Sequence, residues 1–217
     1  MLLATDLDGT FLAGDLQYRQ KLYSIINEHP GIQLVFVTGR GMESILPLFA
    51  HELPVPRPNY IICDVGATIL NGNTMTPVVN LQSPIDDRWV GSDKVLKAIE
   101  GIEGLEPQRV PQQRRCSFFF NDKTDIEKLK RAVTQLECEL ILSAGKFADV
   151  LPKGVNKGST LNALVNYLEF APGEVLTAGD TFNDLSLFNA GYKGVVVGNA
   201  EEGLLKATSD NEYIYQA

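Results

Sequence analysis

Short runs of apolar residues, each closed by a polar residue or a glycine, recur along the chain and predict buried strands. Stretches with apolar residues at helical spacing lie between them, as at Leu161, Leu164, Val165 and Leu168. Because strands that are apolar on both faces belong to parallel sheets covered by helices, this pattern predicts an α/β fold. The predicted strands are 2–6, 33–38, 60–63, 175–180 and 194–199. The predicted helices lie around 22–26, 45–49, 157–168 and 184–188, and an Asn-Gly-Asn hairpin is predicted over 69–76.

The pattern changes between residues 83 and 152. The segments predicted there are a helix at 92–99, a strand at 116–120, an amphipathic helix at 126–136 and a strand pair across 139–151. Single helices alternating with short strands are typical of an α+β domain, and about 70 residues are enough for a small one. We therefore expect a Rossmann-like three-layer core with a parallel sheet, formed by 1–82 and 153–217, and a small α+β cap domain over 83–152.

The overall composition narrows the set of partners. The chain has 217 residues, and its 27 Asp and Glu outnumber its 19 Lys and Arg, for a formal net charge of −8. Nucleic-acid binding needs clustered Lys and Arg, so we expect neither nucleic acid nor an anionic membrane as a partner. Three widely spaced cysteines indicate free thiols, and no export signal or apolar run of about 20 residues is present, so we expect a cytoplasmic protein. The oligomeric state stays open, and a monomer is compatible with the sequence.

Polar residues with chemical capacity lie where the predicted strands end. Ligands of an open α/β sheet bind outside the carboxyl ends of its strands, so these residues are expected to face one crevice. They are Asp6 and Asp8 after the first strand, Thr38 after the second, Lys157 at a helix start, and Asp180, Asn183 and Asp184 after the fourth.

Several carboxylates in one crevice raise one another's pKa unless a cation compensates them. Mg²⁺ suits a small number of carboxylates, because it keeps water and phosphate oxygens as its other ligands. Phosphate is also the group that the Lys157 ammonium, the Thr38 hydroxyl and the N–H groups of a glycine-rich turn would bind. A single Asp-x-Asp-Gly segment would be interpreted as a turn, but the conjunction favours a Mg²⁺ site beside a phosphate site.

Four segments follow one another in a fixed order: DLDGT (6–10), VFVTGR (35–40), NKGSTL (156–161) and AGDTFND (178–184). They match the four motifs of the haloacid dehalogenase superfamily of phosphohydrolases, which the chain resembles across most of its core. The position of the insert resembles the type IIB cap of that superfamily. Two more segments, IICDVGATI (61–69) and DVLPKGVNKGSTL (149–161), look like those of sucrose-phosphate phosphatases and related sugar-phosphate phosphatases.

The resemblance implies a Mg²⁺-dependent phosphatase that hydrolyses a sugar or glycoside phosphate monoester through an aspartyl phosphate. Asp6 is the implied nucleophile, and Asp8 is the implied acid that protonates the leaving oxygen and then the base that activates water. The implied metal ligands are Asp6, Asp8 through its backbone carbonyl, Asp180 and, directly or through water, Asp184. The implied phosphate-binding residues are Thr38, Gly39, Lys157 and Asn183.

Residues that choose among substrates are less clearly marked. Arg40 is expected either to touch the substrate or to form a structural ion pair with the nearby acids. Arg114 belongs to an Arg- and Gln-rich stretch before the 116–120 strand, where a solvated face is the alternative interpretation. Ser143 and Lys146 lie in a polar turn that would overhang the crevice. We expect these four residues to contribute to substrate specificity.

Two other functions use parts of the same pattern. A phosphosugar mutase would move the phosphoryl group between sugar positions, so inorganic phosphate would not accumulate. A non-catalytic signalling module would accept a phosphoryl group on Asp64, which ends the third strand. That module leaves the Thr38-Gly39-Arg40 segment, the cap and the 178–184 segment without a role, which makes it the weaker alternative.

Overall fold

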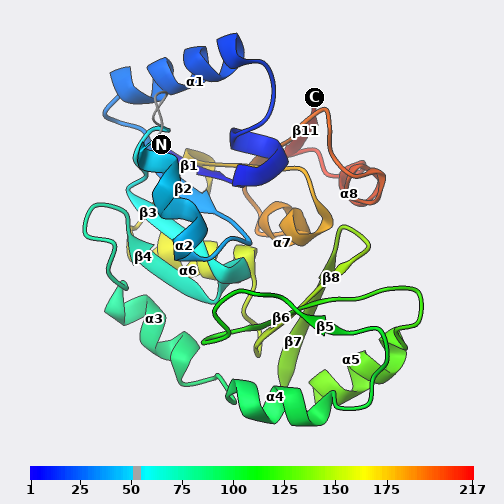
Figure 1. The fold of residues 1–217 in the computed structure, drawn as a ribbon. Coiled ribbons are helices and arrows are strands. Elements are labelled where there is room, and N and C mark those ends of the chain that lie inside the picture. The colour runs from blue at the N-terminus through cyan, green and yellow to red at the C-terminus, as the bar shows by residue number, and fades with distance from the viewer. Residues whose placement is uncertain (51–54) are drawn as a thin grey trace.

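A seven-stranded sheet forms the centre of the computed structural model, which describes residues 1–50 and 55–217 (Figure 1). In spatial order its strands are β11 (Ile214–Gln216), β10 (Lys193–Val196), β9 (Val175–Gly179), β1 (Leu2–Thr5), β2 (Gln33–Val37), β3 (Tyr60–Cys63) and β4 (Thr68–Asn71). All neighbours are parallel except β4, which pairs antiparallel with β3 at one edge. The predicted α/β class with a mostly parallel sheet is confirmed.

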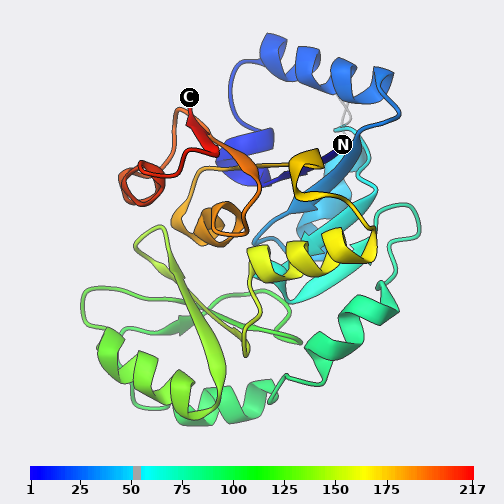
Figure 2. The ribbon, with the colours of Figure 1, turned by 180° about the vertical axis from the view of Figure 1, so that it is seen from behind.

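Helices cover both faces of this sheet. They are α1 (Leu16–Glu28), α2 (Met42–Ile45), α3 (Val79–Asp86), α6 (Lys157–Tyr167), α7 (Leu185–Phe188) and α8 (Glu202–Thr208). Because successive strand residues point to opposite faces, Phe36 packs with Tyr23 of α1 whereas Val37 belongs to the cluster of Leu161 in α6. Figure 2 shows α6, in yellow, lying across the sheet on the side away from α1.

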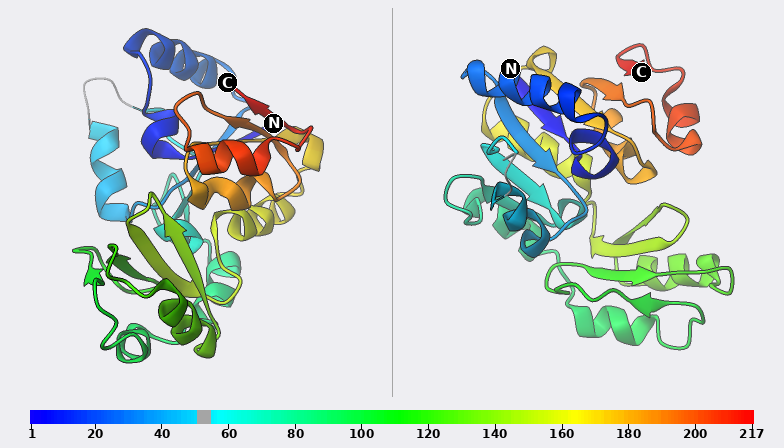
Figure 3. Two further views of the ribbon diagram at one scale, coloured as in Figure 1. Left: turned by 90° about the vertical axis from the view of Figure 1, so that its right-hand side faces the viewer. Right: turned by 45° about the horizontal axis from the view of Figure 1, so that its top comes forward.

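A second, four-stranded antiparallel sheet is formed by the middle of the chain. Its order is β5 (Glu106–Pro107), β6 (Cys116–Phe119), β8 (Phe147–Pro152) and β7 (Cys138–Ser143), with helices α4 (Ser92–Ala98) and α5 (Ile126–Gln135). Val95, Phe118, Leu129 and Val150 belong to a separate apolar cluster between these helices and the strands. Figure 3 shows the second sheet, in green, as a layer of its own beside the first. The division of the chain at residues 82 and 153 stays a prediction.

Two local predictions need correction. The hairpin expected over 69–76 is formed only in part: an antiparallel bridge joins Leu70 to Pro77 and the Asn71 N–H donates to the Thr76 carbonyl, whereas the regular ladder of β4 is with β3. The helix expected around 45–49 is α2 followed by a 3₁₀ turn that contains Pro47, which has no N–H to continue an α-helix. The edge strand β11 and helix α3 were not predicted. Within the described part of the chain, no helix has both the length and the apolar character needed to cross a bilayer.

Candidate active site

The side chains predicted to act together follow three neighbouring strands. Asp6 comes directly after β1, Thr38 after β2 and Asp180 after β9, and the sheet order places β1 between β9 and β2. Both Asp6 and Thr38 are buried, as is Asp180. These residues therefore meet at one edge of the sheet because the carboxyl ends of parallel strands coincide there.

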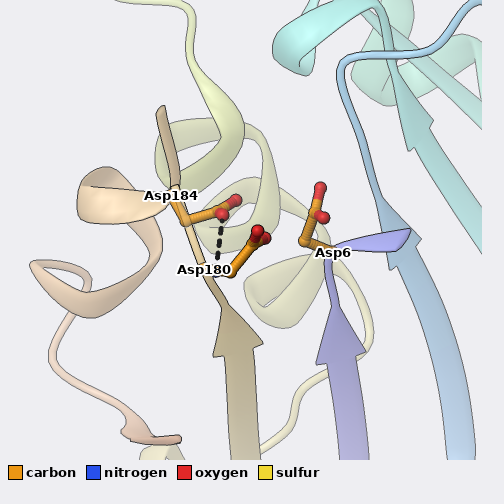
Figure 4. Close-up of side chains that lie close together, drawn as sticks. All are labelled: Asp6, Asp180 and Asp184. Carbon is orange, nitrogen blue, oxygen red and sulfur yellow. Dashed lines mark hydrogen bonds between the residues drawn. The ribbon is translucent and has the colours of Figure 1, made fainter. Parts of the chain in front are cut away.

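Three carboxylates form the centre of this edge. Asp6, Asp180 and Asp184 each offer an oxygen, and these oxygens lie within 4.8 Å of one another (Figure 4). Asp184 is fully buried, and its Oδ2 accepts hydrogen bonds of 3.1 Å from the backbone N–H groups of both Asp180 and Thr181. The loop after β9 thus fixes the direction of the third carboxylate through its own backbone.

Lys157 supplies the positive charge of the cluster. It is the first residue of α6, which Asn156 caps by accepting a hydrogen bond from the Ser159 N–H. Its Nζ donates to Asp6 Oδ1 at 2.7 Å, to Asp184 Oδ1 at 2.6 Å and to Asn183 Oδ1 at 2.8 Å. Burial on its own lowers the pKa of Lys157, but the two carboxylates outweigh it and hold the pKa above the ordinary value.

One lysine does not neutralise three carboxylates. Burial raises the pKa of Asp6 from 3.8 to about 7, with Lys157 lowering it and Asp184 raising it. Burial also raises the pKa of Asp180 to about 6. Both carboxyls therefore lack sufficient positive charge around them, and three hard oxygen ligands at this spacing fit a divalent cation such as Mg²⁺. The Asp8 side chain lies outside this cluster.

Gly9 allows the turn after β1 to pass close to Asp180. Its φ of +82° is a left-handed conformation, and a Cβ there would lie 1.9 Å from Asp180 Oδ2. The next residue, Thr10, donates from Oγ1 to Asp180 Oδ1 at 2.9 Å. The glycine and the hydroxyl of DLDGT are thus required by contact with the loop after β9, 170 residues away in sequence.

Asp8 and Arg40 form a two-pronged ion pair. Arg40 Nε donates to Asp8 Oδ2 at 2.7 Å, and Nη2 donates to Oδ1 at 2.6 Å. The hydrogen bonds to Asp8 raise the pKa of Arg40 above its ordinary value. Of the two interpretations of Arg40, the structure shows the ion pair, and the paired side chains line the cavity described next.

A cavity of about 330 Å³ lies between the two sheets. The predicted residues that line it are Asp6, Asp8, Thr38, Gly39, Arg40, Ser143 and Asn183. Lys157, Asp180 and Asp184 lie behind that lining, in the buried cluster. A volume of this size is at the lower end of the range for small-molecule sites.

Arg114 and Lys146 do not line this cavity, contrary to the expectation for specificity residues. Arg114 Nε is 2.5 Å from Asp86 Oδ1 in α3, and Lys146 Nζ lies 5.0 Å from the centre of the Phe147 ring. Arg115, the next residue in sequence after Arg114, does line the cavity, whereas the side chain of Arg114 is held by Asp86.

Two further charged residues line the cavity: Arg115, which belongs to the predicted Arg- and Gln-rich stretch but was not one of the four specificity residues, and Asp149, which was not predicted. Arg115 precedes β6 and is 4% exposed, and Asp149 lies in β8 and is 5% exposed. Phe147 and Asp149, two residues apart on one strand face, both line the cavity. An acid within the otherwise apolar segment FADVLP was the available signal for Asp149, because an unpaired charge is rarely buried.

A family model described as sucrose-6F-phosphate phosphohydrolase matches residues 1–217. The chain belongs to this family. Its sequence is 50% identical over its whole length to the glucosylglycerol-phosphate synthase of Pseudomonas anguilliseptica, of which it spans 29%. It is 29% identical to the mannosylfructose-phosphate phosphatase of Agrobacterium fabrum, with 99% of this chain and 90% of that relative covered. The chain thus spans less than a third of one relative and nearly all of the other.

A solved member of the family shares the whole fold. The sucrose-phosphatase of Synechocystis sp. PCC6803, solved with sucrose and phosphate, superposes with a TM-score of 0.88 at 26% identity, over 100% of this chain and 91% of that one. With the family match, this likeness confirms the resemblance to sucrose-phosphate phosphatases, and a IIB sugar phosphatase of the haloacid dehalogenase superfamily shares the fold.

Proposed function

We propose that this chain is a Mg²⁺-dependent phosphatase that hydrolyses the phosphate monoester of a glycoside through an aspartyl phosphate. The observation that carries the proposal is the position of Asp6. Its carboxylate reaches the cavity, while Lys157 binds one oxygen of it from behind at 2.7 Å. A buried carboxylate held in one direction beside phosphate-binding groups is arranged for nucleophilic attack.

In the proposed reaction, a carboxylate oxygen of Asp6 bonds to phosphorus as the bond from phosphorus to the sugar oxygen breaks. Asp8, which must first leave its ion pair with Arg40 and take up a proton, gives that proton to the leaving oxygen. Water then attacks the phosphorus of the aspartyl phosphate, Asp8 takes a proton from that water, and inorganic phosphate leaves as the Asp6 carboxylate is restored. Thr38, Gly39 and Asn183 line the same cavity and are the proposed ligands of the phosphoryl oxygens.

The residues that would hold Mg²⁺ are Asp6, Asp180 and Asp184, with the Asp8 backbone carbonyl as the further proposed ligand. A bound Mg²⁺ would supply positive charge for the anionic phosphoryl group. Lys157 Nζ donates to Asp6 at 2.7 Å and to Asp184 at 2.6 Å, and these hydrogen bonds fix the direction of two of these carboxylates.

The proposed substrate is a glycoside with one phosphate and an otherwise neutral remainder. The relatives are named for sucrose-phosphate, mannosylfructose-phosphate and glucosylglycerol-phosphate, in each of which a hexose is joined to a second polyol. In this chain the Arg115 guanidinium lies 3.3 Å from Asp64 and 3.5 Å from Asp149. Its charge is therefore already compensated, so among the residues that the structure describes at that end of the cavity no free cation is left for a second anionic group.

Phosphate release tests the proposal directly. The purified chain is assayed with the three glycoside phosphates, with hexose bisphosphates and with p-nitrophenyl phosphate, in Mg²⁺ and after chelation. We expect the highest kcat/KM with a glycoside monophosphate, loss of activity on chelation and recovery when Mg²⁺ is restored. Activity that survives chelation would contradict the metal site, and phosphate that changes position on the sugar without release would favour the mutase.

Asp6→Asn is expected to abolish turnover and leave the fold intact, because the amide is nearly the same size and is a much weaker nucleophile. Asp15→Asn is the matched control, since Asp15 precedes α1 and its side chain caps no N–H group. Circular dichroism verifies that both variants are folded. Wild-type turnover by Asp6→Asn would overturn the assignment of the nucleophile.

A further inference from the structure

Arg115 connects the second sheet to the predicted phosphate-binding loop of the first. It immediately precedes β6, and its side chain is 4% exposed. Nη1 donates to the Gly39 carbonyl at 2.8 Å, across a gap of 76 residues in sequence. Nε lies 3.3 Å from Asp64 Oδ1. One guanidinium thus contacts two separate loops that follow β2 and β3.

Those two loops are themselves joined by backbone hydrogen bonds. The Asp64 N–H donates to the Arg40 carbonyl at 2.9 Å, and the Val65 N–H donates to the Thr38 carbonyl at 3.1 Å. Asp64 and Val65 both have left-handed backbones, with φ of 53° and 57°, which non-glycine residues adopt only when their surroundings enforce it. The Thr38-Gly39-Arg40 segment is therefore supported from one side by 64–65, and Arg115 contacts both segments.

Acidic groups on both sheets hold Arg115 in this position. Asp64 Oδ2 accepts from Thr68 Oγ1 at 2.7 Å, which turns Oδ1 toward the guanidinium. On the second sheet, Asp149 accepts a short hydrogen bond from Ser117 and lies 3.5 Å from Nη1. Burial raises the pKa of Asp149, while Arg115 lowers it. The guanidinium is balanced by one carboxylate from each sheet.

We propose that Arg115 is a positioning residue: its contacts with Gly39 and Asp64 seat the second sheet over the cavity and fix the Thr38–Gly39 backbone that binds the phosphoryl group. The inference rests on the proposed function for the role of that backbone. It differs from a role in binding the sugar, because the group positioned is common to every phosphate ester.

The test compares Arg115→Met and Arg115→Lys with wild type on a glycoside phosphate and on p-nitrophenyl phosphate. A misplacement of about 1 Å in a binding group costs about 100-fold, so we expect Arg115→Met to lower kcat/KM about 100-fold on both esters, mostly in kcat. Arg115→Lys keeps the charge but not the forked geometry, and an intermediate loss is expected. Lys130→Met, which removes an exposed charge from α5, is the control and should match wild type.

A cycle with Asp64→Asn separates positioning from general weakening. Because both side chains act on one loop, the fold-loss of kcat/KM in the double variant should be much smaller than the product of the fold-losses in the two single variants. Thermal melts verify that every variant is folded at the assay temperature. A loss confined to KM for the glycoside ester would show a sugar ligand, and unchanged kinetics in folded Arg115→Met would show a structural contact; either result overturns the inference.

Binding of inorganic phosphate, measured by calorimetry, tests the positioning role without requiring that the chain hydrolyse any ester. If wild type releases no phosphate from any ester, the proposed function fails. Weaker phosphate binding by Arg115→Met than by wild type and Lys130→Met would then still support the positioning role, and equal binding by all three would overturn it.

Discussion

At the scale of single residues, charge balance explains the burial of Lys157. An ammonium group without water needs acceptors on all sides, and Asp6, Asp184 and Asn183 provide three within 2.8 Å. The same contacts fix the directions of the two carboxylates. Asp6 lies at the cavity, and Asp184 accepts from the backbone N–H groups of 180–181. Removing the lysine would leave two buried carboxylates close together without a compensating positive charge.

Lys157→Met is therefore expected to lower the free energy of unfolding by about 3–5 kcal/mol, the cost of leaving buried charges unpaired. Urea unfolding without Mg²⁺ measures it. The control is Lys153→Met, because Lys153 pairs with Glu137 at the surface with both side chains more than 60% exposed. That variant should unfold at the wild-type urea concentration. Equal effects of the two substitutions would contradict the importance of burial.

At the scale of elements, the start of α6 is positioned by the turn after β3. Gly66 has a φ of +109°, and a Cβ there would lie 2.4 Å from the backbone carbon of Asn156. Thr160 Oγ1 donates to the Gly66 carbonyl at 2.8 Å. The turn and the helix thus approach at backbone distance, which sets the place from which Lys157 reaches the carboxylates.

Gly66→Ala should lower stability by about 1–3 kcal/mol more than Gly91→Ala, because only the first adds a steric overlap. Both glycines have positive φ, but nothing lies within 4 Å of a Cβ at Gly91. The difference between the two variants in urea unfolding therefore isolates the contact with α6. We also expect Gly66→Ala to reduce phosphatase activity through displacement of Lys157. Equal losses of stability would show that backbone conformation alone matters.

The elements differ in how far sequence could predict them. The central strands were predictable, because a strand buried on both faces has a continuous apolar run, such as the one within 33–38. Helix α6 was predictable because its buried face requires apolar residues at helical spacing. The Asn-Gly-Asn signal predicted the turn after β4, but the ladder between β4 and β3 depends on packing beyond that local signal. Helix α3 contains Pro84 and begins at Val79, which is 71% exposed, so its sequence hides the helical pattern.

The residues of the candidate site also differ in how far the sequence could predict them. Asp6, Thr38 and Asp180 were predictable together, because each directly follows a strand whose neighbours the α/β pattern implies. Arg115 could not be distinguished from its neighbour Arg114 within the Arg- and Gln-rich stretch. Their different surroundings depend on where the second sheet lies over the first, and nothing local to either residue encodes that placement.

At the scale of the whole molecule, the acidic cluster links stability to pH. The pKa of Asp6 rises from 3.8 to about 7 and that of Asp180 to about 6, so the folded chain binds these two protons more tightly than the unfolded chain. Stability from this source is complete below pH 3.8 and is lost as the pH rises to about 7. A bound cation favours the ionised carboxylates and opposes that loss.

Mg²⁺ is therefore expected to raise the melting temperature more at pH 8 than at pH 5. Thermal melts with Mg²⁺ and with a chelator at the two pH values measure this difference. Titration of groups remote from the site changes the melting temperature equally with and without Mg²⁺, so it does not contribute to the difference. Asp180→Asn removes one of the two carboxyls and should reduce the effect at pH 8. A Mg²⁺ stabilisation that does not change with pH would contradict the coupling between these carboxyls and the cation.

The central position of β1 has a consequence for biosynthesis. Leu2 pairs in register with Gln33 of β2 on one side and with Val175 of β9 on the other. About 170 residues of chain thus separate β1 from its second neighbour β9, and such distant pairings form slowly. Lys157 and Asp180 are synthesised after Asp6, so Asp6 acquires its cluster of charged neighbours only when the sheet closes around it.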